Sequence, residues 1–328
     1  MNKNRQRSIA VDVMKGIGII LVVLGHTVHN DLCAWIYTFH MPLFFIAVGL
    51  FFKSGNDIYL KRFKSILIPY FFFAILSYPY WRFLEMKYRP LADDFNANAH
   101  FWDIFWQTHQ FEFNAVLWFL PCLFLIIILL NVILTLTKNR IIIVCVCILW
   151  IISASLYMPD IKSFWLKETW FAFPFVAIGL FVSSSLSNIE NKLQTTPWYY
   201  KIAAIIPLLA IIILPHGGKM MSSNYPNGYL YYFITALICV SAVFILSTLL
   251  TSQKWLSWLG RNTLVIMCLH EPLKRIVIKI FAIATHQSTD ELRESTILSI
   301  LVTAVVILIL VPVCKLISKR LPWILGRF

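Results

Sequence analysis

The sequence predicts an all-α fold, a polytopic bundle of transmembrane helices, and three observations lead to it. Of the 328 residues, 59% are hydrophobic and only 13% are charged, whereas soluble globular chains carry about 25% charged residues. The hydrophobic residues form long continuous runs, as helices that cross a bilayer do. Short basic segments stand at the ends of these runs, where cytoplasmic loops are expected.

The formal net charge of +13 does not indicate a nucleic-acid partner, because the basic residues follow the ends of the apolar runs. The basic start "MNKNRQRS" leads into an apolar run without a small-residue cleavage site, so we expect a span there and no signal peptide. The seven cysteines lie in or beside apolar runs, and their pattern predicts neither a disulfide framework nor a metal site.

We expect about ten spans, since a helical span needs about 20 residues at a rise of about 1.5 Å each. Their approximate ranges are 9–29, 33–53, 63–85, 115–137, 141–158, 170–186, 200–214, 228–250, 259–283 and 295–318. An even number places both termini on one side. An orientation with both termini in the cytoplasm puts most of the 28 lysine and arginine residues into cytoplasmic segments.

The first predicted span carries three polar groups that hydrocarbon penalises. Lys15 and His26 are eleven residues apart, which places them about 20° apart around a helix and about 16 Å apart along it. Asp12 precedes Lys15 by three residues and can pair with it. Ionisable groups that share one face inside a membrane indicate a functional site. The structural alternative is mutual neutralisation of Asp12 and Lys15, with His26 bonded to a neighbouring helix.

The second span holds His40 two residues before Pro42, which frees a backbone carbonyl. If the first two spans form a tight hairpin around Asn30 and Asp31, His26 and His40 both lie in the outer half of the membrane. His40 either belongs to a functional site or forms a hydrogen bond that packs two helices together, and the sequence favours neither alternative. The following loop carries Arg62 and Lys64. The enrichment of basic residues in cytoplasmic loops is enough to explain them, and the same two charges would also suit a phosphate ligand.

The ninth span contains His270 and Glu271 directly before Pro272. An acidic group beside a histidine and a proline predicts an irregular turn that lines a cavity, and an interhelical hydrogen bond is the alternative. The external loop 86–114 mixes carboxylates, histidines and aromatic residues. It is either an interfacial aromatic belt or a platform on which a carbohydrate stacks.

Five segments together resemble the acyltransferase-3 family of integral membrane O-acyltransferases. They are "DVMKGIGIILVVLGH" (12–26), "FHMPLFFIAVGL" (39–50), "KRFK" before "IPYFFF", "LWFLPCLF" (117–124) and "WLGRNTLVIMCLHEPL" (258–273). The resemblance covers most of the chain in the same order and is greatest to the short sugar O-acetyltransferases, including the fucose 4-O-acetylase-like subgroup. It implies a single membrane domain over residues 1–328, with no appended SGNH domain.

The resemblance implies transfer of an acyl group, most often acetyl, from cytoplasmic acyl-CoA to a hydroxyl of an extracytoplasmic or lipid-linked sugar. Acyl-CoA is then a substrate, and no permanently bound cofactor or metal is expected. The protein would lie in the bacterial cytoplasmic (inner) membrane among lipids. Its acceptor would be a surface glycan or a lipid-linked sugar, and its oligomeric state stays open, a homo-oligomer included.

The family usually pairs an arginine with a histidine eleven positions later, and here Lys15 stands at the arginine position of His26. The resemblance makes His26 the catalytic base, since an alcohol needs one to attack a thioester. Asp12, Lys15, Arg62 and Lys64 are the expected donor-binding residues. The expected supporting or cavity-lining residues are His40, Trp118, Asn262, His270 and Glu271.

A polytopic transporter or flippase for a sugar-lipid or small solute is the alternative function, because intramembrane Asp, Lys and His also build proton relays. The sequence shows no inverted repeat and no matched pair of broken helices of the kind such transporters use. Release of CoA from a thioester would separate the two functions.

Overall fold

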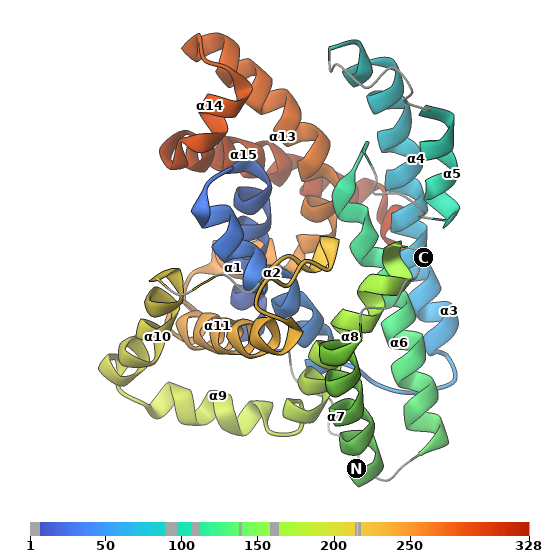
Figure 1. The fold of residues 1–328 in the computed structure, drawn as a ribbon, viewed down its shortest axis with the longest axis vertical. Coiled ribbons are helices and arrows are strands. Elements are labelled where there is room, and N and C mark those ends of the chain that lie inside the picture. Colours follow the sequence, from blue (N-terminus) through green and yellow to red (C-terminus); the bar gives the residue numbers. More distant parts are fainter. Residues whose placement is uncertain are drawn as a thin grey trace. The chain divides into compact units, whose positions relative to one another are not determined.

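The computed structural model describes residues 7–88, 97–106, 112–137, 140–157, 164–213, 215 and 218–327. The fold is all-helical, with 84% of the described residues in helices. Within the described residues no strand forms, and one isolated bridge joins Lys219 to Asn224. The predicted all-α class is therefore confirmed (Figure 1).

Five helical segments are long and apolar enough to cross a membrane: α1 (Ile9–Thr27), α2 (Asp31–Leu50), Ala115–Leu136, α11 (Tyr229–Leu249) and α15 (Thr296–Arg320). A sixth arises if α8 (Phe164–Val182) and α9 (Leu186–Thr195), bent by 71° at their junction, count as one broken span. The remaining predicted spans overlap helices within the described residues, with different bounds. The total of about ten spans and the orientation with both termini inside remain predictions.

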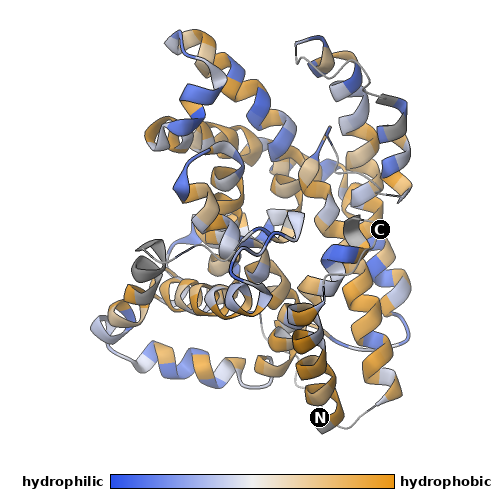
Figure 2. Cartoon of the chain, in the orientation of Figure 1, coloured by the Kyte–Doolittle hydropathy of each residue, from blue (hydrophilic) through white to orange (hydrophobic). Residues whose placement is uncertain are grey.

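The chain divides into two compact units, of which unit 1 comprises Met1–Lys53, Thr137–Met158 and Phe171–Thr263. Unit 1 contains α1, α2, α7 (Arg140–Leu156), α8 from Phe171 onward, α9, α10 (Trp198–Ile213), the 3-10 turn η4 (Met220–Ser222), α11 and α12 (Lys254–Arg261). Within it, α9 and α10 both lie against α11 (Figure 1). The amphipathic α9 is the more hydrophilic of these helices, as Figure 2 shows.

The core of unit 1 forms where α1, α2, α8 and α11 bring large apolar side chains together. Phe39, Phe45, Phe175 and Tyr232 are fully buried. The backbones of α2 and α8 approach so closely that a Cβ atom on Gly49 would lie 2.0 Å from the Val176 carbonyl oxygen. This close packing suits helices within a membrane, where small residues let backbones approach.

Unit 2 comprises Ser54–Leu136, Pro159–Trp170 and Leu264–Phe328. Its elements are α3 (Ile58–Arg62), the π-helical turn η1 (Phe63–Leu67), α4 (Ile68–Phe83), η2 (Glu85–Lys87), α5 (Ala97–Trp106), η3 (Ala115–Trp118), α6 (Phe119–Leu136), α13 (Thr263–Thr285), α14 (Thr289–Glu294), α15 and η5 (Pro322–Leu325). Asn131 on α6 accepts a hydrogen bond from the Gly55 amide and donates to the Tyr59 hydroxyl. These bonds fix the start of the segment that carries Arg62 and Lys64.

The predicted ninth span, 259–283, is wrong in its start. The structure ends α12 at Arg261 and begins α13 at Thr263. Asn262 stands between them, and its Nδ2 donates to the Trp258 carbonyl at 2.8 Å, satisfying a carbonyl at the end of α12. Residues 254–261 therefore form a separate amphipathic helix with one buried face, which a search for continuous apolar runs merges with the next span.

The predicted irregular turn at Pro272 is also wrong, because α13 continues through the proline. Proline lacks an amide hydrogen, so the carbonyl of Cys268, four residues earlier, loses its helical donor. Asn114 supplies a donor in its place, with Nδ2 at 2.9 Å from the Cys268 oxygen. A side chain from another segment thus lets the helix run on, as in other proline-containing membrane helices.

Candidate active site

Asp12 organises a cluster of charges in the first turn of α1. Its Oδ1 pairs with Lys15 Nζ at 2.9 Å and its Oδ2 pairs with Arg7 Nε at 2.6 Å. The predicted pairing of Asp12 with Lys15 is confirmed. The Asp12 side chain is 8% exposed and that of Lys15 is 25% exposed. Lys15 therefore keeps part of its side chain accessible while Asp12 holds the ammonium group in position.

Two glycines allow α12 to pack backbone against backbone on this part of α1. A Cβ atom on Gly260 would lie 1.7 Å from the carbonyl oxygen of Asp12, and one on Gly16 would lie 2.1 Å from that of Leu256. No side chain larger than hydrogen fits at either position. The backbone that carries Asp12 and Lys15 is thereby fixed by α12, whose Lys254 and Trp255 are exposed.

Ser8 links the N-terminal end of α1 to α9 by a hydrogen bond. Ser8 caps α1, with its Oγ accepting from the Val11 amide at 3.0 Å. The same hydroxyl donates to the Glu190 carboxylate on α9. The N-terminal end of α1 is thus positioned by both α9 and α12.

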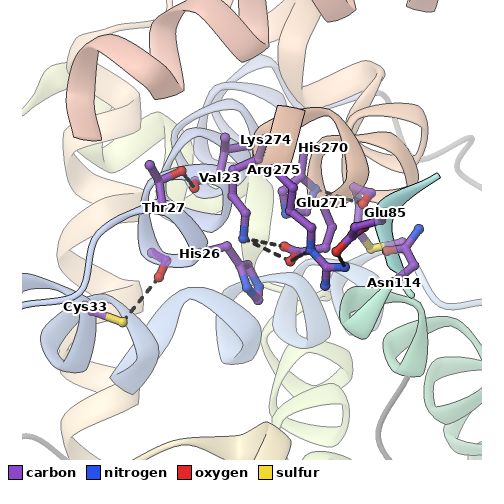
Figure 3. Close-up of polar contacts among 12 residues, drawn as sticks. Val23, His26, Thr27, Cys33, Glu85, Asn114, His270, Glu271, Lys274 and Arg275 are labelled. Carbon is purple, nitrogen blue, oxygen red and sulfur yellow. Dashed lines mark hydrogen bonds and ion pairs between the residues drawn. The ribbon is translucent and has the colours of Figure 1, made fainter. Parts of the chain in front are cut away.

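The other end of α1 forms the predicted tight hairpin with α2, since α1 ends at Thr27 and α2 begins at Asp31. Asn30 caps α2 by accepting from the Leu32 amide. Cys33 Sγ donates to the Gly25 carbonyl at 3.2 Å across the hairpin (Figure 3). The hairpin carries His26 on α1 and His40 on α2 and brings their rings to a centroid distance of 6.5 Å. That both lie in the outer half of the membrane stays a prediction.

His26, Tyr37 and His40 form a cluster of three rings in which every pair meets edge to face. The ring centroids lie 5.5 Å apart for His26 and Tyr37, 4.8 Å for Tyr37 and His40, and 6.5 Å for His26 and His40. The Tyr37 hydroxyl lies 3.0 Å from His26 Nδ1. Tyr37 and His40 are buried and His26 is half-buried, so the cluster presents His26 as its most accessible ring.

His40 and His270 have their tautomers fixed by their own helices. His40 Nδ1 lies 2.9 Å from the Ile36 carbonyl, and His270 Nδ1 lies 3.0 Å from the Ile266 carbonyl and 2.8 Å from that of Met267. A carbonyl oxygen only accepts, so Nδ1 must carry the proton in both rings. In its neutral form each ring then offers Nε2 as an acceptor.

A short hairpin places a cation over the Tyr37 ring. The Lys219 amide and carbonyl both bond to Asn224, and η4 turns between them. Lys219 Nζ lies 5.1 Å from the centroid of the Tyr37 ring. A lysine ammonium over an aromatic face is attracted by the ring's electrons, so this contact helps to hold the Tyr37 ring in place.

In unit 2, four charged side chains form a cluster around Glu271, in which Glu271 and Lys274 are buried and Arg275 and Glu85 are half-buried (Figure 3). Lys274 Nζ bonds both carboxylate oxygens of Glu271, at 2.9 and 2.8 Å. Arg275 bonds Glu271 through Nε at 3.2 Å and Glu85 through Nη1 at 2.7 Å. Two carboxylates and two cations balance, which lowers the cost of keeping charges out of water.

The basic segment of unit 2 contains the guanidinium of Arg62, and no ion pair to it is found within the part of the chain that the structure describes. Among the described residues, no group hydrogen-bonds the buried Nε of Arg62. Burial lowers the pKa of the Arg62 guanidinium from its usual value, although an arginine remains charged. Lys64 follows on the π-helical turn η1, an element frequent at functional sites.

The C-terminal turn η5 packs against this basic segment. A Cβ atom on Gly326 would lie 2.0 Å from the Lys64 carbonyl oxygen, and Gly326 has a φ of +67°. Trp323 also meets Phe72 edge to face at 5.7 Å. The backbone at Lys64 is therefore braced by residues near the C-terminus.

Two predicted supporting residues have structural contacts. Trp118 is buried at the end of η3, edge-on to Phe119, and Asn262 caps α12. Of the predicted platform 86–114, residues 89–96 and 107–111 lie outside the described residues. Helix α5 is described, and Trp102, Phe105 and Trp106 are exposed on it.

Sequence reasoning missed Tyr37, Arg275, Glu85 and Asn114. Tyr37 precedes His40 by one helical turn, and Arg275 follows Glu271 by one turn, so helical spacing could have indicated both. Glu85 and Asn114 reach their partners only through the fold. Within the described residues, no group of three or more His, Cys, Asp or Glu side chains could hold a metal ion.

Comparison with known proteins identifies the family. The model of the acyltransferase-3 family, described as an acyltransferase domain, matches residues 8–318. No curated protein and no solved structure matches the chain. The match spans nearly the whole chain and agrees with the apolar helices that qualify as membrane spans. The protein is therefore an integral membrane protein that belongs to the acyltransferase-3 family of membrane acyltransferases.

Proposed function

We propose that the protein transfers an acyl group, most often acetyl, from cytoplasmic acyl-CoA to a hydroxyl of an extracytoplasmic or lipid-linked sugar, with His26 as the general base. The observation that carries the proposal is the His26–Tyr37–His40 cluster near the C-terminal end of α1, a helix that holds Lys15 toward its N-terminal end. Because α1 is one unbroken helix, Lys15 and His26 lie about 16 Å apart along it. An extended pantetheine arm is of this length.

The proposed reaction is a single displacement at the thioester. His26 Nε2 removes the proton of the sugar hydroxyl as its oxygen attacks the thioester carbonyl carbon. A carbon–oxygen bond forms and the carbon–sulfur bond breaks. The proton on His26 then passes to the departing thiolate, and an ester and CoA with a free thiol result. A positioned base typically contributes about 10²- to 10⁴-fold to such a rate.

The phosphates of acyl-CoA are proposed to bind to cations that neighbouring side chains hold in place. Lys15 is fixed by Asp12 and remains partly accessible. In unit 2, Arg62 keeps its charge with a buried Nε that no described group satisfies, and Lys64 follows it. An unneutralised guanidinium that has lost water is favourable for binding an anion.

The acceptor sugar is proposed to bind on α5. This helix exposes Trp102, Phe105 and Trp106, whose faces suit stacking against a sugar ring. His100 on the same helix lies 3.3 Å from the buried Asp103, which fixes one side of the helix and leaves the aromatic side available. We further propose that His40, His270 and Glu271 orient the reacting groups or stabilise the oxyanion, and that Trp118 and Asn262 shape the cavity. The bacterial cytoplasmic membrane is the proposed location.

The deciding experiment measures release of the CoA thiol from acetyl-CoA by the purified protein in detergent, with and without sugar acceptors. His26→Asn should reduce release by about 10²-fold or more while the protein stays folded. His286→Asn is the matched control, since His286 is exposed and has a φ of +54°, which asparagine tolerates. A wild-type rate in His26→Asn would exclude His26 as the base. Absence of thiol release by the wild type would favour a transporter.

Mass spectrometry of surface glycans from cells with and without the gene would identify the acceptor. Loss of one acyl mass from a glycan upon deletion supports the proposal and names the sugar. An unchanged glycan profile together with CoA release in vitro would instead indicate a different acceptor class.

A further inference from the structure

One nitrogen of the His26 ring meets a hydroxyl of the neighbouring helix α2. Nδ1 lies 3.0 Å from the hydroxyl oxygen of Tyr37. An imidazole that is hydrogen-bonded at Nδ1 keeps a defined orientation, and its chemistry then takes place at Nε2. The contact with Tyr37 therefore orients the His26 ring through Nδ1.

Tyr37 is itself buried and held by two neighbouring side chains, so its hydroxyl is a fixed partner. It is buried, with 8% of its surface exposed. The His40 ring meets it edge to face, and the Lys219 ammonium lies over its face. His40 is in turn fixed by the Ile36 carbonyl. A side chain packed in this way positions its partner with little loss of entropy on reaction.

The direction of the hydrogen bond follows from the role of His26. A base must present an unprotonated nitrogen to the acceptor hydroxyl, so Nε2 carries the lone pair and Nδ1 carries the hydrogen. Nδ1–H then donates to the Tyr37 oxygen. When Nε2 takes the proton of the sugar hydroxyl, the positive charge of the imidazolium is shared with this hydrogen bond until the proton passes to the thiolate.

We propose that Tyr37 is the positioning residue of the catalytic base: its hydroxyl oxygen accepts from His26 Nδ1–H and so fixes the tautomer in which Nε2 is the base. This inference rests on the proposed function. It assigns to a tyrosine the task of the third group in catalytic triads, which orients the base without touching the substrate.

The test is Tyr37→Phe, which keeps the ring against His40 and beneath Lys219 and removes only the hydroxyl oxygen. We expect kcat to fall about 10- to 100-fold, with the KM for acetyl-CoA changed by less than about twofold. Tyr229→Phe is the matched control. It removes a buried hydroxyl of the same unit that donates to the Phe171 carbonyl at 2.7 Å, and it should leave kcat unchanged.

A double variant separates positioning from a general structural role. If Tyr37 acts through His26, then His26→Asn/Tyr37→Phe has the same residual rate as His26→Asn alone. A further loss of about 10-fold in the double variant would overturn the proposal.

Nitrogen NMR of histidine-labelled protein tests the tautomer without turnover, with the His26 signals assigned from their absence in His26→Asn. The wild type should show a protonated Nδ1 and an unprotonated Nε2, and Tyr37→Phe should shift this distribution. Unchanged His26 signals in Tyr37→Phe would refute the positioning role. If the wild type has the expected tautomer but transfers no acyl group, the proposed function fails and the hydrogen bond stands.

Discussion

Asn114 Nδ2 donates to the carbonyl oxygen of Cys268 at 2.9 Å, and this carbonyl is the one that Pro272 deprives of its helical donor. Asn114 is fully buried and also donates to the Ser77 hydroxyl at 3.0 Å. A residue distant in sequence therefore replaces a backbone hydrogen bond inside α13. The repair lets His270 and Glu271, which directly precede Pro272, stay on a regular helix.

Asn114→Ala should lower the free energy of unfolding by about 1–3 kcal/mol, because it leaves the buried Cys268 carbonyl without this donor. Pro272→Ala returns an amide hydrogen to position 272 and so offers the carbonyl a helical donor again. The cost of Asn114→Ala should therefore be smaller in a Pro272→Ala background. A double-mutant cycle measured by denaturant unfolding checks this, and equal costs in both backgrounds would show that the two residues act independently.

Gly260→Ala should separate α12 from α1, since the added Cβ would lie 1.7 Å from the Asp12 carbonyl oxygen. Overpacking of this kind typically costs about 1–3 kcal/mol. The control is Gly55→Ala, where a Cβ meets nothing within 4 Å. Thermal unfolding in detergent compares the two variants. A Gly260→Ala protein as stable as Gly55→Ala would mean that the backbones of α1 and α12 are not in contact.

Glu271→Gln should be strongly destabilising, by about 3–5 kcal/mol. It leaves the buried Lys274 and the half-buried Arg275 with only the Glu85 carboxylate to balance their two charges. Glu271→Gln/Lys274→Met removes one charge of each sign and should recover much of the loss. Denaturant unfolding of the two variants measures the difference. If the double variant is no more stable than the single one, the uncompensated charge of Lys274 is not the cause of the destabilisation in Glu271→Gln.

Lys15→Ala should weaken CoA binding about 10-fold, which corresponds to about 1.4 kcal/mol, because it removes an ammonium proposed to contact the donor phosphates. Lys15→Arg keeps the charge and should retain binding. Lys279→Ala removes an equal charge from an exposed site on α13 and serves as the control. Calorimetric titration with CoA decides, and equal affinity of Lys15→Ala and wild type would remove Lys15 from the donor site.

Trp102→Ala should raise the KM for the sugar acceptor and leave the KM for acetyl-CoA unchanged, because its face is proposed to stack on the sugar. Trp102 is 59% exposed on α5, and Trp255, at 57% on α12, offers a control of equal size and exposure. Trp255→Ala should leave both constants unchanged. Initial rates at varied acceptor concentration provide the measurement. An equal loss in both variants would indicate that these tryptophans act only as membrane anchors.

Local spacing accounts for the parts of the site that sequence analysis found. Asp12 and Lys15 are three residues apart on one helix, so their pairing follows from helical geometry. The meeting of His26 with His40 follows from a connection of only three residues between α1 and α2. The same reasoning fails where a contact crosses many residues, as for Arg275 with Glu85 or Asn114 with Cys268.

The sequence alone determined that the protein is a helical membrane protein and that Asp12, Lys15 and His26 share one face of α1. Composition and a period of about 3.6 residues are local properties of a chain. Tertiary structure decided the partners of these groups. Only the folded chain shows that α12 is separate from α13 and packs on the backbone of Asp12, and that Tyr37 holds His26. These contacts depend on backbone approach and ring orientation, which a pattern of residue types does not encode.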